Sequence, residues 1–278
     1  MTSKTWFVTG ASAGIGRVVT EQLLERGDRV AATARRPEVL SDLADRFGER
    51  LWTAALDVTD TKALNGTVER AFADLRRIDV IYSNAGRGSV GAAEEMTVAS
   101  IDEQIALNMT APIHLLRAVL PHLRAQGGGR FIQMSTMGAH ITTPGASMYH
   151  ASKWGVEGFF ESVMAEVEPF GVGITMVEPG IIRTTFGANL DVAPGMWEYA
   201  DGPAGQIRAY LSSVDNVTAE APGDPAKVAA AIIASADATP APRRLALGSD
   251  AYNAMRAALS GRIAELDAGK DTAASIDF

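Results

Sequence analysis

Short apolar segments of strand length alternate with segments of helix length along most of this chain, and this alternation restricts its possible folds more than any other feature. We expect strands at residues 5–9, 29–33, 51–55, 78–83, 130–135 and 173–177, and helices at 15–25, 60–75, 100–124 and 149–170. Several strands, such as the one containing Trp6-Phe7-Val8, are apolar without interruption, which is typical of parallel strands covered on both faces. The pattern predicts an α/β fold with a doubly wound parallel β-sheet flanked by helices on both faces.

Composition excludes several classes of protein and of site. The 278-residue chain has a formal charge of −8, no cysteine and four scattered histidines. Disulfides, zinc–thiolate sites and cysteine nucleophiles are therefore excluded, and we expect no metal site. The negative charge gives no footprint for nucleic acid or an anionic membrane. No apolar run approaches the roughly 20 residues that span a bilayer, and no signal peptide opens the chain, so the expectation is a cytoplasmic protein.

The regular alternation stops between about residues 183 and 223, where Gly, Pro and aromatic residues interrupt any periodicity. A loop of this length is usually functional or mobile, so we predict a substrate loop, with a helical surface insertion as the alternative. A helix at 225–235, a strand at 244–247 and a helix at 250–266 follow, and the tail from residue 268 is expected to be frayed. With no repeat or linker in the sequence, residues 1–278 are expected to form one domain, with a C-terminal helical extension at about 249–278.

The first predicted strand leads directly into a glycine-rich turn, Thr9-Gly10-Ala11-Ser12-Ala13-Gly14-Ile15-Gly16. Glycine lets the backbone adopt positive φ and approach a bound group, and the helix that follows offers free N–H groups and a partial positive charge. We expect a dinucleotide pyrophosphate to bind here. A merely tight turn is the alternative, because the Gly-x-x-x-Gly-x-Gly spacing departs from the Gly-x-Gly-x-x-Gly fingerprint.

The end of the second strand bears on which dinucleotide is bound. In NAD enzymes of this architecture an acidic residue there holds the ribose 2′-hydroxyl. Here the strand is followed by Ala34-Arg35-Arg36. A guanidinium can accept a 2′-phosphate through two hydrogen bonds and keeps its charge, so the sequence favours NADP(H) over NAD(H). The alternative is that the two arginines only cap the start of a helix.

Tyr149 and Lys153 lie four residues apart in a predicted helix, which places them one above the other on the same face. A lysine ammonium there stabilises a phenolate, and a tyrosine with a lowered pKa can protonate a carbonyl or deprotonate an alcohol. Taken alone, the pair could equally be two neighbours on a solvated surface. Its chemical meaning depends on the other motifs.

Those motifs are the glycine-rich turn, Asn84-Ala85-Gly86 after the fourth strand, Ser135-Thr136-Met137-Gly138 after the fifth, and Pro179-Gly180 after the sixth. In this order, together with Tyr149-x-x-x-Lys153, they resemble the short-chain dehydrogenase/reductase family in its branch of about 250 residues. The resemblance is dense over residues 4–184 and loose beyond. It implies a single-domain Rossmann fold that binds a nicotinamide dinucleotide.

The resemblance also implies roles for individual residues. The catalytic group would be Asn108, Ser135, Tyr149 and Lys153, with Ser135 on the substrate oxygen and Asn108 supporting a water-linked proton path to Lys153. Tyr149 and Lys153 would also touch the cofactor. The remaining cofactor-binding residues would be Gly10, Ser12, Ala13, Gly14, Ile15, Gly16, Arg35, Arg36, Asp57, Val58, Asn84, Ala85, Gly86, Pro179, Gly180, Ile182 and Thr184. Ala13 departs from relatives that carry a basic residue there, so the 2′-phosphate would rest on Arg35 and Arg36.

We therefore expect an NADP(H)-dependent oxidoreductase, such as a carbonyl reductase, that interconverts a ketone or aldehyde and an alcohol. Phe186, Trp197 and Tyr199 suggest a fairly apolar substrate, and His140 is expected to be a pocket wall or a surface residue. The alternatives are a non-catalytic NADP(H)-sensing regulator and an epimerase or dehydratase. Relatives usually pair through helices corresponding to 100–124 and 149–170, so a homodimer or homotetramer is expected. Phe159, Phe160 and Met164 could serve such contacts or the monomer core.

Overall fold

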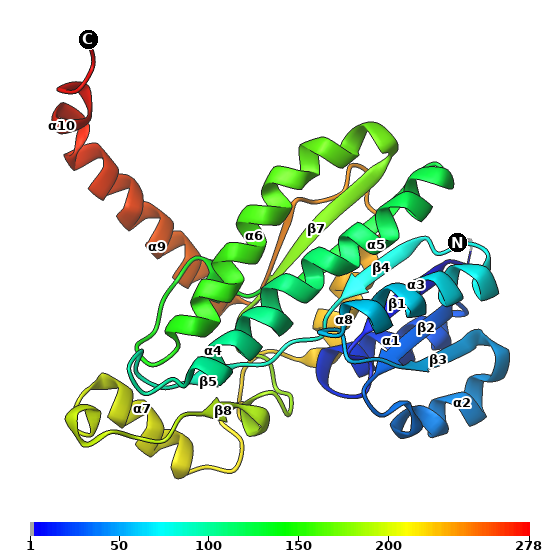
Figure 1. The fold of residues 1–278 in the computed structure, drawn as a ribbon, viewed down its shortest axis with the longest axis horizontal. Helices are drawn as coiled ribbons and strands as arrows, with labels where there is room; N and C mark the ends of the chain where they lie inside the picture. The colour runs from blue at the N-terminus through cyan, green and yellow to red at the C-terminus, as the bar shows by residue number, and fades with distance from the viewer. Residues whose placement is uncertain (1–2) are drawn as a thin grey trace.

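The computed structural model describes residues 3–278, and its centre is a seven-stranded sheet (Figure 1). The strand order is β3-β2-β1-β4-β6-β7-β9, and every neighbouring pair is parallel. The doubly wound parallel sheet predicted from the alternation is confirmed. The strands are β1 (Thr5–Thr9), β2 (Arg29–Ala34), β3 (Leu51–Ala55), β4 (Val80–Ser83), β6 (Gly129–Met134), β7 (Val172–Pro179) and β9 (Arg244–Leu247).

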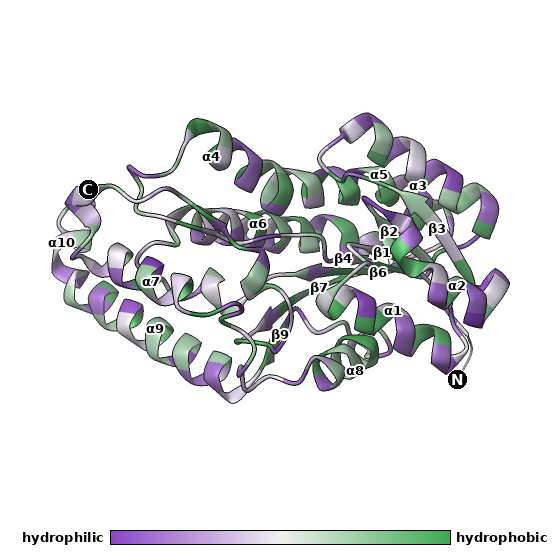
Figure 2. Ribbon diagram, turned by 90° about the horizontal axis from the view of Figure 1, so that it is seen from below, coloured by the Kyte–Doolittle hydropathy of each residue, from purple (hydrophilic) through white to green (hydrophobic). Residues whose placement is uncertain are grey.

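Helices cover both faces of this sheet, as the view from below shows (Figure 2). Trp6 and Val8 of β1 join the core of one face, whereas Phe7 between them joins the core of the other. Side chains alternate along a strand, so a strand buried on both faces needs an unbroken apolar run. The first face carries α1 (Gly14–Arg26), α2 (Ser41–Phe47) and α8 (Pro225–Ser235), and the second carries α3 (Thr61–Leu75), α5 (Ala111–Ala125) and α6 (Ser147–Val167).

The order of the strands fixes where a ligand can bind. The chain winds outward from β1 through β2 to β3, then returns to β4 on the other side of β1. In open sheets of this kind, a crevice forms outside the carboxyl ends of the strands at that reversal. The loops that follow β1, β4 and β6 leave from this edge, and they carry the glycine-rich turn, Asn84-Ala85-Gly86 and Ser135-Thr136.

Two helical features differ from the sequence expectation. The short helix α2 was not predicted, because its seven residues are too few to reveal a helical period. Its Leu43 is buried in the first core together with Leu40 of the preceding turn. The helix predicted at 100–124 is three consecutive segments: α4 (Val98–Ile105), a π-helical turn (Ala106–Thr110) and α5.

The irregular segment at 183–223 contains little regular structure, as its composition suggested. It holds the two-residue strand β8 (Asp191–Val192), the α-helix α7 (Pro203–Ser212) and two short 3-10 helices (Gly187–Asn189 and Trp197–Tyr199). β8 pairs in parallel with β5 (Ser89–Val90) in the loop after β4. The segment therefore lies beside the carboxyl edge of the sheet, with α7 and β8 below α4 in Figure 1.

The C-terminal part ends in a helix that leaves the body of the protein. α9 (Ser249–Ala268) buries only Ala251 and Met255, and its far half extends away from the sheet (Figure 1). The expectation of a frayed tail is corrected, because α10 (Lys270–Ala274) continues the chain with its own backbone hydrogen bonds. Within residues 3–278, no helix combines the length and apolarity that crossing a membrane requires.

Candidate active site

The glycine-rich turn connects β1 to α1 in a conformation that needs its glycines. Gly10 has φ +67°, and a Cβ on Gly16 would lie 2.4 Å from the Gly10 carbonyl oxygen. The N-cap position of α1 is Ala13, whose side chain makes no capping hydrogen bond, and the first turn carries no acidic residue. The N-terminus of α1 thus presents backbone N–H groups and a partial positive charge to the carboxyl edge of the sheet, which suits a phosphate group.

Asn84 holds this turn in place. Its side-chain amide donates to the carbonyls of Thr9 (3.0 Å) and Gly10 (3.1 Å), and the Tyr82 hydroxyl donates to its Oδ1 (3.1 Å). The hydroxyl of Thr9 in turn accepts from the backbone N–H groups of Asn84 (2.9 Å) and Ala85 (3.1 Å). Asn84 and Ala85 therefore join the ends of β1 and β4.

The two arginines after β2 are available to a ligand. Arg35 and Arg36 are exposed, and neither side chain makes a hydrogen bond or ion pair within residues 3–278. Nearby, the pKa of Asp57 is lowered by hydrogen bonds from the hydroxyl and backbone N–H of Thr59, with a smaller effect from the charge of Arg35. A carboxylate and a guanidinium thus flank the ends of β2 and β3.

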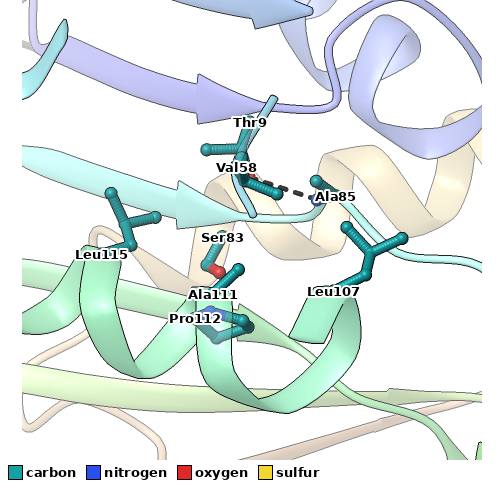
Figure 3. Close-up of a pocket in the computed structure, with 8 residues that line it drawn as sticks. All are labelled: Thr9, Val58, Ser83, Ala85, Leu107, Ala111, Pro112 and Leu115. Carbon is teal, nitrogen blue, oxygen red and sulfur yellow. Dashed lines mark hydrogen bonds between the residues drawn. The ribbon is translucent and has the colours of Figure 1, made fainter. Parts of the chain in front are cut away.

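A small cavity lies between the end of β4 and α5, and Figure 3 shows its walls, including the hydrogen bond between Thr9 and Ala85. Its volume of about 10 Å³ is near the lower limit for one water molecule. A ring the size of adenine does not fit in it. The lining residues are Thr9, Val58, Ser83, Ala85, Leu107, Ala111, Pro112 and Leu115.

Tyr149 lies in the first turn of α6, half-buried at the carboxyl edge. Burial raises the pKa of its phenol, and a hydrogen bond with the Thr136 hydroxyl partly opposes this effect. The ring of Phe186, from the 183–223 segment, lies with its centroid 6.2 Å from that of Tyr149. The phenol therefore has an apolar neighbour in Phe186. Trp197, another aromatic residue of the same segment, is 84% exposed.

Lys153 follows Tyr149 by one helical turn and is buried, with 5% of its surface exposed. Its amine donates to the carbonyl of Met134 at the end of β6 (3.0 Å). Burial lowers the pKa of the amine from 10.5 to about 8, against the opposing effect of Glu157. Within residues 3–278, no hydrogen bond joins this amine to the phenol of Tyr149. The pair occupies one helix face, as its spacing predicted, with the lysine deeper than the tyrosine.

Ser135 does not point toward Tyr149. Its hydroxyl donates to Glu157 Oε1 (2.5 Å) in the protein interior, and only 3% of the residue is exposed. The next residue, Thr136, is half-buried, and its hydroxyl lowers the pKa of the Tyr149 phenol. Successive side chains at the end of a strand leave on opposite sides, so only one of two adjacent hydroxyls can face the crevice. Ser135, which the sequence expectation placed beside Tyr149, therefore has its hydroxyl engaged by Glu157, and the hydroxyl that acts on Tyr149 is that of Thr136.

Asn108 lies in the π-helical turn between α4 and α5 and is 1% exposed. Its Nδ2 donates to the Arg87 carbonyl (2.8 Å), and its Oδ1 accepts from the Arg87 backbone N–H (3.1 Å). Single π-helical turns occur often at functional sites. Asn108 fixes the loop that follows Gly86, and its amide also lies 3.4 Å from the Ser152 hydroxyl next to Lys153.

A buried group of charged side chains lies behind Ser135, and the sequence reasoning missed it. His140 Nε2 lies 3.1 Å from Glu178 Oε1 and 3.5 Å from Glu157 Oε2. Arg244 reaches both carboxylates, with its Nε 2.9 Å from Glu178 and an NH2 group 3.3 Å from Glu157. His140 was expected to be a pocket wall or a surface residue, but its ring contacts this interior group. Glu178 within the apolar run of β7 was the available signal, because an acid in a buried strand needs partners.

The segment after β7 joins the crevice to the C-terminal helix. Gly180 has no room for a side chain, because a Cβ there would lie 2.2 Å from the Asp250 carboxylate of α9. Ile182 is buried, and the Thr184 side chain faces Gly14, whose Cβ would lie 3.9 Å from the Thr184 Cβ. Thr184 thus reaches the glycine-rich turn, and Ile182 shares a core cluster with Ala11 of that turn.

Glu95 anchors the 183–223 segment to the loop after β5. Its buried carboxylate accepts from the backbone N–H groups of Ala92 (2.8 Å) and Met196 (2.8 Å) and pairs with Arg208 of α7 (2.6 Å). These contacts and the pairing of β5 with β8 hold the segment against the carboxyl edge. The segment thereby brings the ring of Phe186 to 6.2 Å from that of Tyr149.

Comparison with known proteins agrees with this geometry. The family model for short chain dehydrogenases matches residues 4–194. Oxidoreductase BOA17 of Botryotinia fuckeliana is 35% identical over 270 residues, covering 97% of this chain and 96% of the relative. A short-chain dehydrogenase from Streptomyces avermitilis superposes with a TM-score of 0.90 at 36% identity, covering 100% of both chains.

A further solved structure, a metagenomic short-chain oxidoreductase in complex with NADP, superposes with a TM-score of 0.69 at 25% identity. The alignment covers 88% of this chain and 97% of that one. The family model spans the glycine-rich turn, Tyr149, Lys153 and the segment after β7. This chain belongs to the short-chain dehydrogenase family of oxidoreductases, because the family model matches it and because relatives of similar sequence and fold match nearly its whole length.

Proposed function

We propose that this protein is an NADP(H)-dependent oxidoreductase that interconverts a ketone or aldehyde and an alcohol, with Tyr149 as the acid and base. The observation that carries the proposal is the placement of the Tyr149 phenol in the first turn of α6, one helical turn from the buried amine of Lys153, with the Thr136 hydroxyl acting to lower the pKa of the phenol. This group shares the carboxyl edge of the sheet with the glycine-rich turn, so a dinucleotide seated on α1 would reach it.

Each side chain then has a defined task. A bound nicotinamide would supply or accept the hydride. The Thr136 hydroxyl would hold the substrate oxygen, and the Tyr149 phenol would donate its proton to that oxygen during reduction. Because burial raises the pKa of Tyr149, the phenol carries the proton that a general acid needs at neutral pH. In the reverse direction, the ammonium of Lys153 would stabilise the phenolate.

The preference for NADP(H) rests on Arg35 and on the absence of an acid at the end of β2. Arg35 is exposed and has no protein partner among the described residues, so its guanidinium can meet a 2′-phosphate without losing another contact. The similar metagenomic short-chain oxidoreductase, whose structure was solved in complex with NADP, supports this choice. Gly10, Gly14 and Gly16 would bring the α1 N-terminus close to the pyrophosphate, with Lys153 near the nicotinamide ribose.

The proposed substrate is fairly apolar next to its carbonyl. The support comes from Phe186 beside Tyr149 and from Leu190, which with Phe186 packs over Gly88: a Cβ on Gly88 would lie 2.6 Å from Leu190 Cδ2 and 3.2 Å from the Phe186 ring. These two side chains give the substrate loop an apolar face near the reacting group.

The direct test is the oxidation of NADPH, followed by absorbance, with a panel of ketones and aldehydes of increasing apolar area. We expect turnover, and we expect Tyr149→Phe to lower kcat by about 10²- to 10⁴-fold while NADPH still binds. Tyr252→Phe is the matched control, since Tyr252 is exposed on α9. Equal rates in the wild type and Tyr149→Phe would contradict the mechanism.

A further inference from the structure

Glu157 occupies an unusual position for an acidic residue. It lies on α6 one turn after Lys153, with 4% of its surface exposed, and its Oε1 accepts the hydroxyl of Ser135 (2.5 Å). Ser135 lies between Met134, whose carbonyl accepts the Lys153 amine, and Thr136. Glu157 therefore holds the middle residue of the three that carry the contacts between β6 and the catalytic face of α6.

The remaining charges around Glu157 come from three other elements. His140 belongs to the loop after β6, Glu178 to β7 and Arg244 to β9. On α6 itself, Glu161 pairs with Arg244 from the outside and is half-exposed. Burial raises the pKa of Glu157, and the charge of Glu178 adds to this effect. The Ser135 hydrogen bond, His140 and Arg244 act in the opposite direction and favour the carboxylate.

These contacts do not resemble a cation site. The atoms of His140, Glu157 and Glu178 that could bind a metal lie within 4.8 Å of one another. However, the guanidinium of Arg244 already contacts both carboxylates, and Ser135 takes up one oxygen of Glu157. A bound cation would have to displace a permanent positive charge.

We propose that Glu157 is a positioning residue of the active site: it clamps the end of β6 to α6 through Ser135, and its charge keeps the Lys153 amine protonated. This inference rests on the proposed function for its catalytic consequence. A carboxylate one helical turn from an amine favours the ammonium form. Burial alone lowers the pKa of Lys153, and Glu157 is the group that opposes this effect.

The two parts of the proposal respond to different substitutions. Glu157→Gln removes the charge but keeps an oxygen that can accept from Ser135. We expect the alkaline limb of the pH profile for carbonyl reduction to move down by about one pH unit, because Lys153 then loses its proton at lower pH. Ser135→Ala keeps the charge and removes the clamp, so we expect kcat to fall about 10- to 100-fold with no shift of that limb.

Glu161→Gln is the matched control for charge. It removes an acid one turn further along α6 that also pairs with Arg244, but Glu161 makes no contact with Ser135. We expect the pH limb to stay in place in this variant. An equal shift in Glu157→Gln and Glu161→Gln would mean that general electrostatics, and not the position of Glu157, controls Lys153, and the proposal would be overturned.

A second readout needs no turnover. The difference in unfolding free energy between Lys153→Met and the parent protein depends on pH through the folded-state pKa of Lys153. We expect this difference to begin falling about one pH unit lower in a Glu157→Gln background than in the parent. An unchanged onset would overturn the proposal. If no carbonyl is turned over, the proposed function fails, and this measurement still decides the role of Glu157.

If Glu157→Gln does not fold, Ser135→Ala and Glu157→Asp decide the matter. The aspartate keeps the charge, but its side chain is one methylene shorter, so it should lose the Ser135 contact. The pH at which the stability difference between Lys153→Met and its parent begins to fall should stay within about half a unit of its value in the Glu157 background. An unchanged kcat in Ser135→Ala, or an onset in Glu157→Asp displaced by a full unit, would overturn the clamp or the charge effect respectively.

Discussion

Replacing Lys153 by methionine should make the protein more stable while it removes activity. The folded protein holds the amine at a pKa of about 8, compared with 10.5 for an unperturbed lysine. This difference of about 2.5 corresponds to about 3 kcal/mol of preference for the neutral form, at 1.36 kcal/mol per pKa unit. Methionine has a similar length and no charge, and the Met134 carbonyl keeps the Gln133 side-chain amide as a donor (2.8 Å).

The sign of the effect depends on pH. Below pH 8 the amine is charged in the folded and the unfolded states, so the cost of burying the charge is fully present. Between pH 8 and about 10.5 the folded protein loses the proton first, and the unfolded state binds more protons, so the stability of the wild type rises with pH. The advantage of Lys153→Met should therefore be about 3 kcal/mol at pH 7 and vanish near pH 10.5.

Urea denaturation at pH 7 and at pH 9.5, with both variants fitted to the same m-value, measures this advantage. Lys227→Met is the control, since Lys227 is exposed on α8 and should change stability by less than about 0.5 kcal/mol. A Lys153→Met protein less stable than the wild type at pH 7 would refute the reasoning. So would an advantage that is the same at both pH values, because packing and not charge would then explain it.

Three other substitutions test the cofactor turn and the reacting group. Gly16→Ala should abolish tight NADPH binding in a fluorescence titration, because its Cβ would lie 2.4 Å from Asn84 Nδ2 and from the Gly10 carbonyl oxygen. The control Gly158→Ala has open space around its Cβ and should raise the free energy of unfolding by about 0.5–1 kcal/mol. Arg35→Ala should lower kcat/KM for NADPH about 10- to 100-fold and leave the value for NADH unchanged; equal losses would contradict a 2′-phosphate contact. Thr136→Ala should lower kcat about 10²-fold in the same assay and Thr136→Ser should restore most of it, a recovery that a purely structural role would not require.

The features predicted correctly from the sequence depend on local geometry. Gly10, Gly14 and Gly16 lie in one turn between a strand and a helix, so their spacing alone determines which backbone atoms crowd together. Tyr149 and Lys153 lie on one helix, whose period places them on the same face. The sheet follows from the same kind of evidence, because alternating strands and helices leave few arrangements in which every apolar strand is covered.

The choice between Ser135 and Thr136 could not be made in this way. Both are hydroxyl residues at the end of β6, and the phase of the strand at its last residue decides which one faces the crevice. That phase is visible only through partners distant in sequence, such as Glu157 on α6 and Val177 on β7, whose carbonyl accepts the Ser135 backbone N–H (2.8 Å). The charged group around His140 was missed for a related reason, since its members come from four separate elements.

The two sides of the crevice differ in polarity, and in the proposed function one would face the cofactor and the other the substrate. From one side, the α1 N-terminus, Arg35 and the backbone amides of the glycine-rich turn offer positive charge and hydrogen-bond donors to phosphates. From the other side, Phe186 and Leu190 approach over Gly88, where the lack of a side chain lets the substrate loop come close to Tyr149. Glu95 and Arg208 hold that loop by a buried ion pair away from the phenol, so the wall next to the reacting carbonyl can remain apolar. Variation of Phe186 and Leu190 should therefore change which carbonyl compounds are accepted, whereas variation of the opposite side should change only the cofactor.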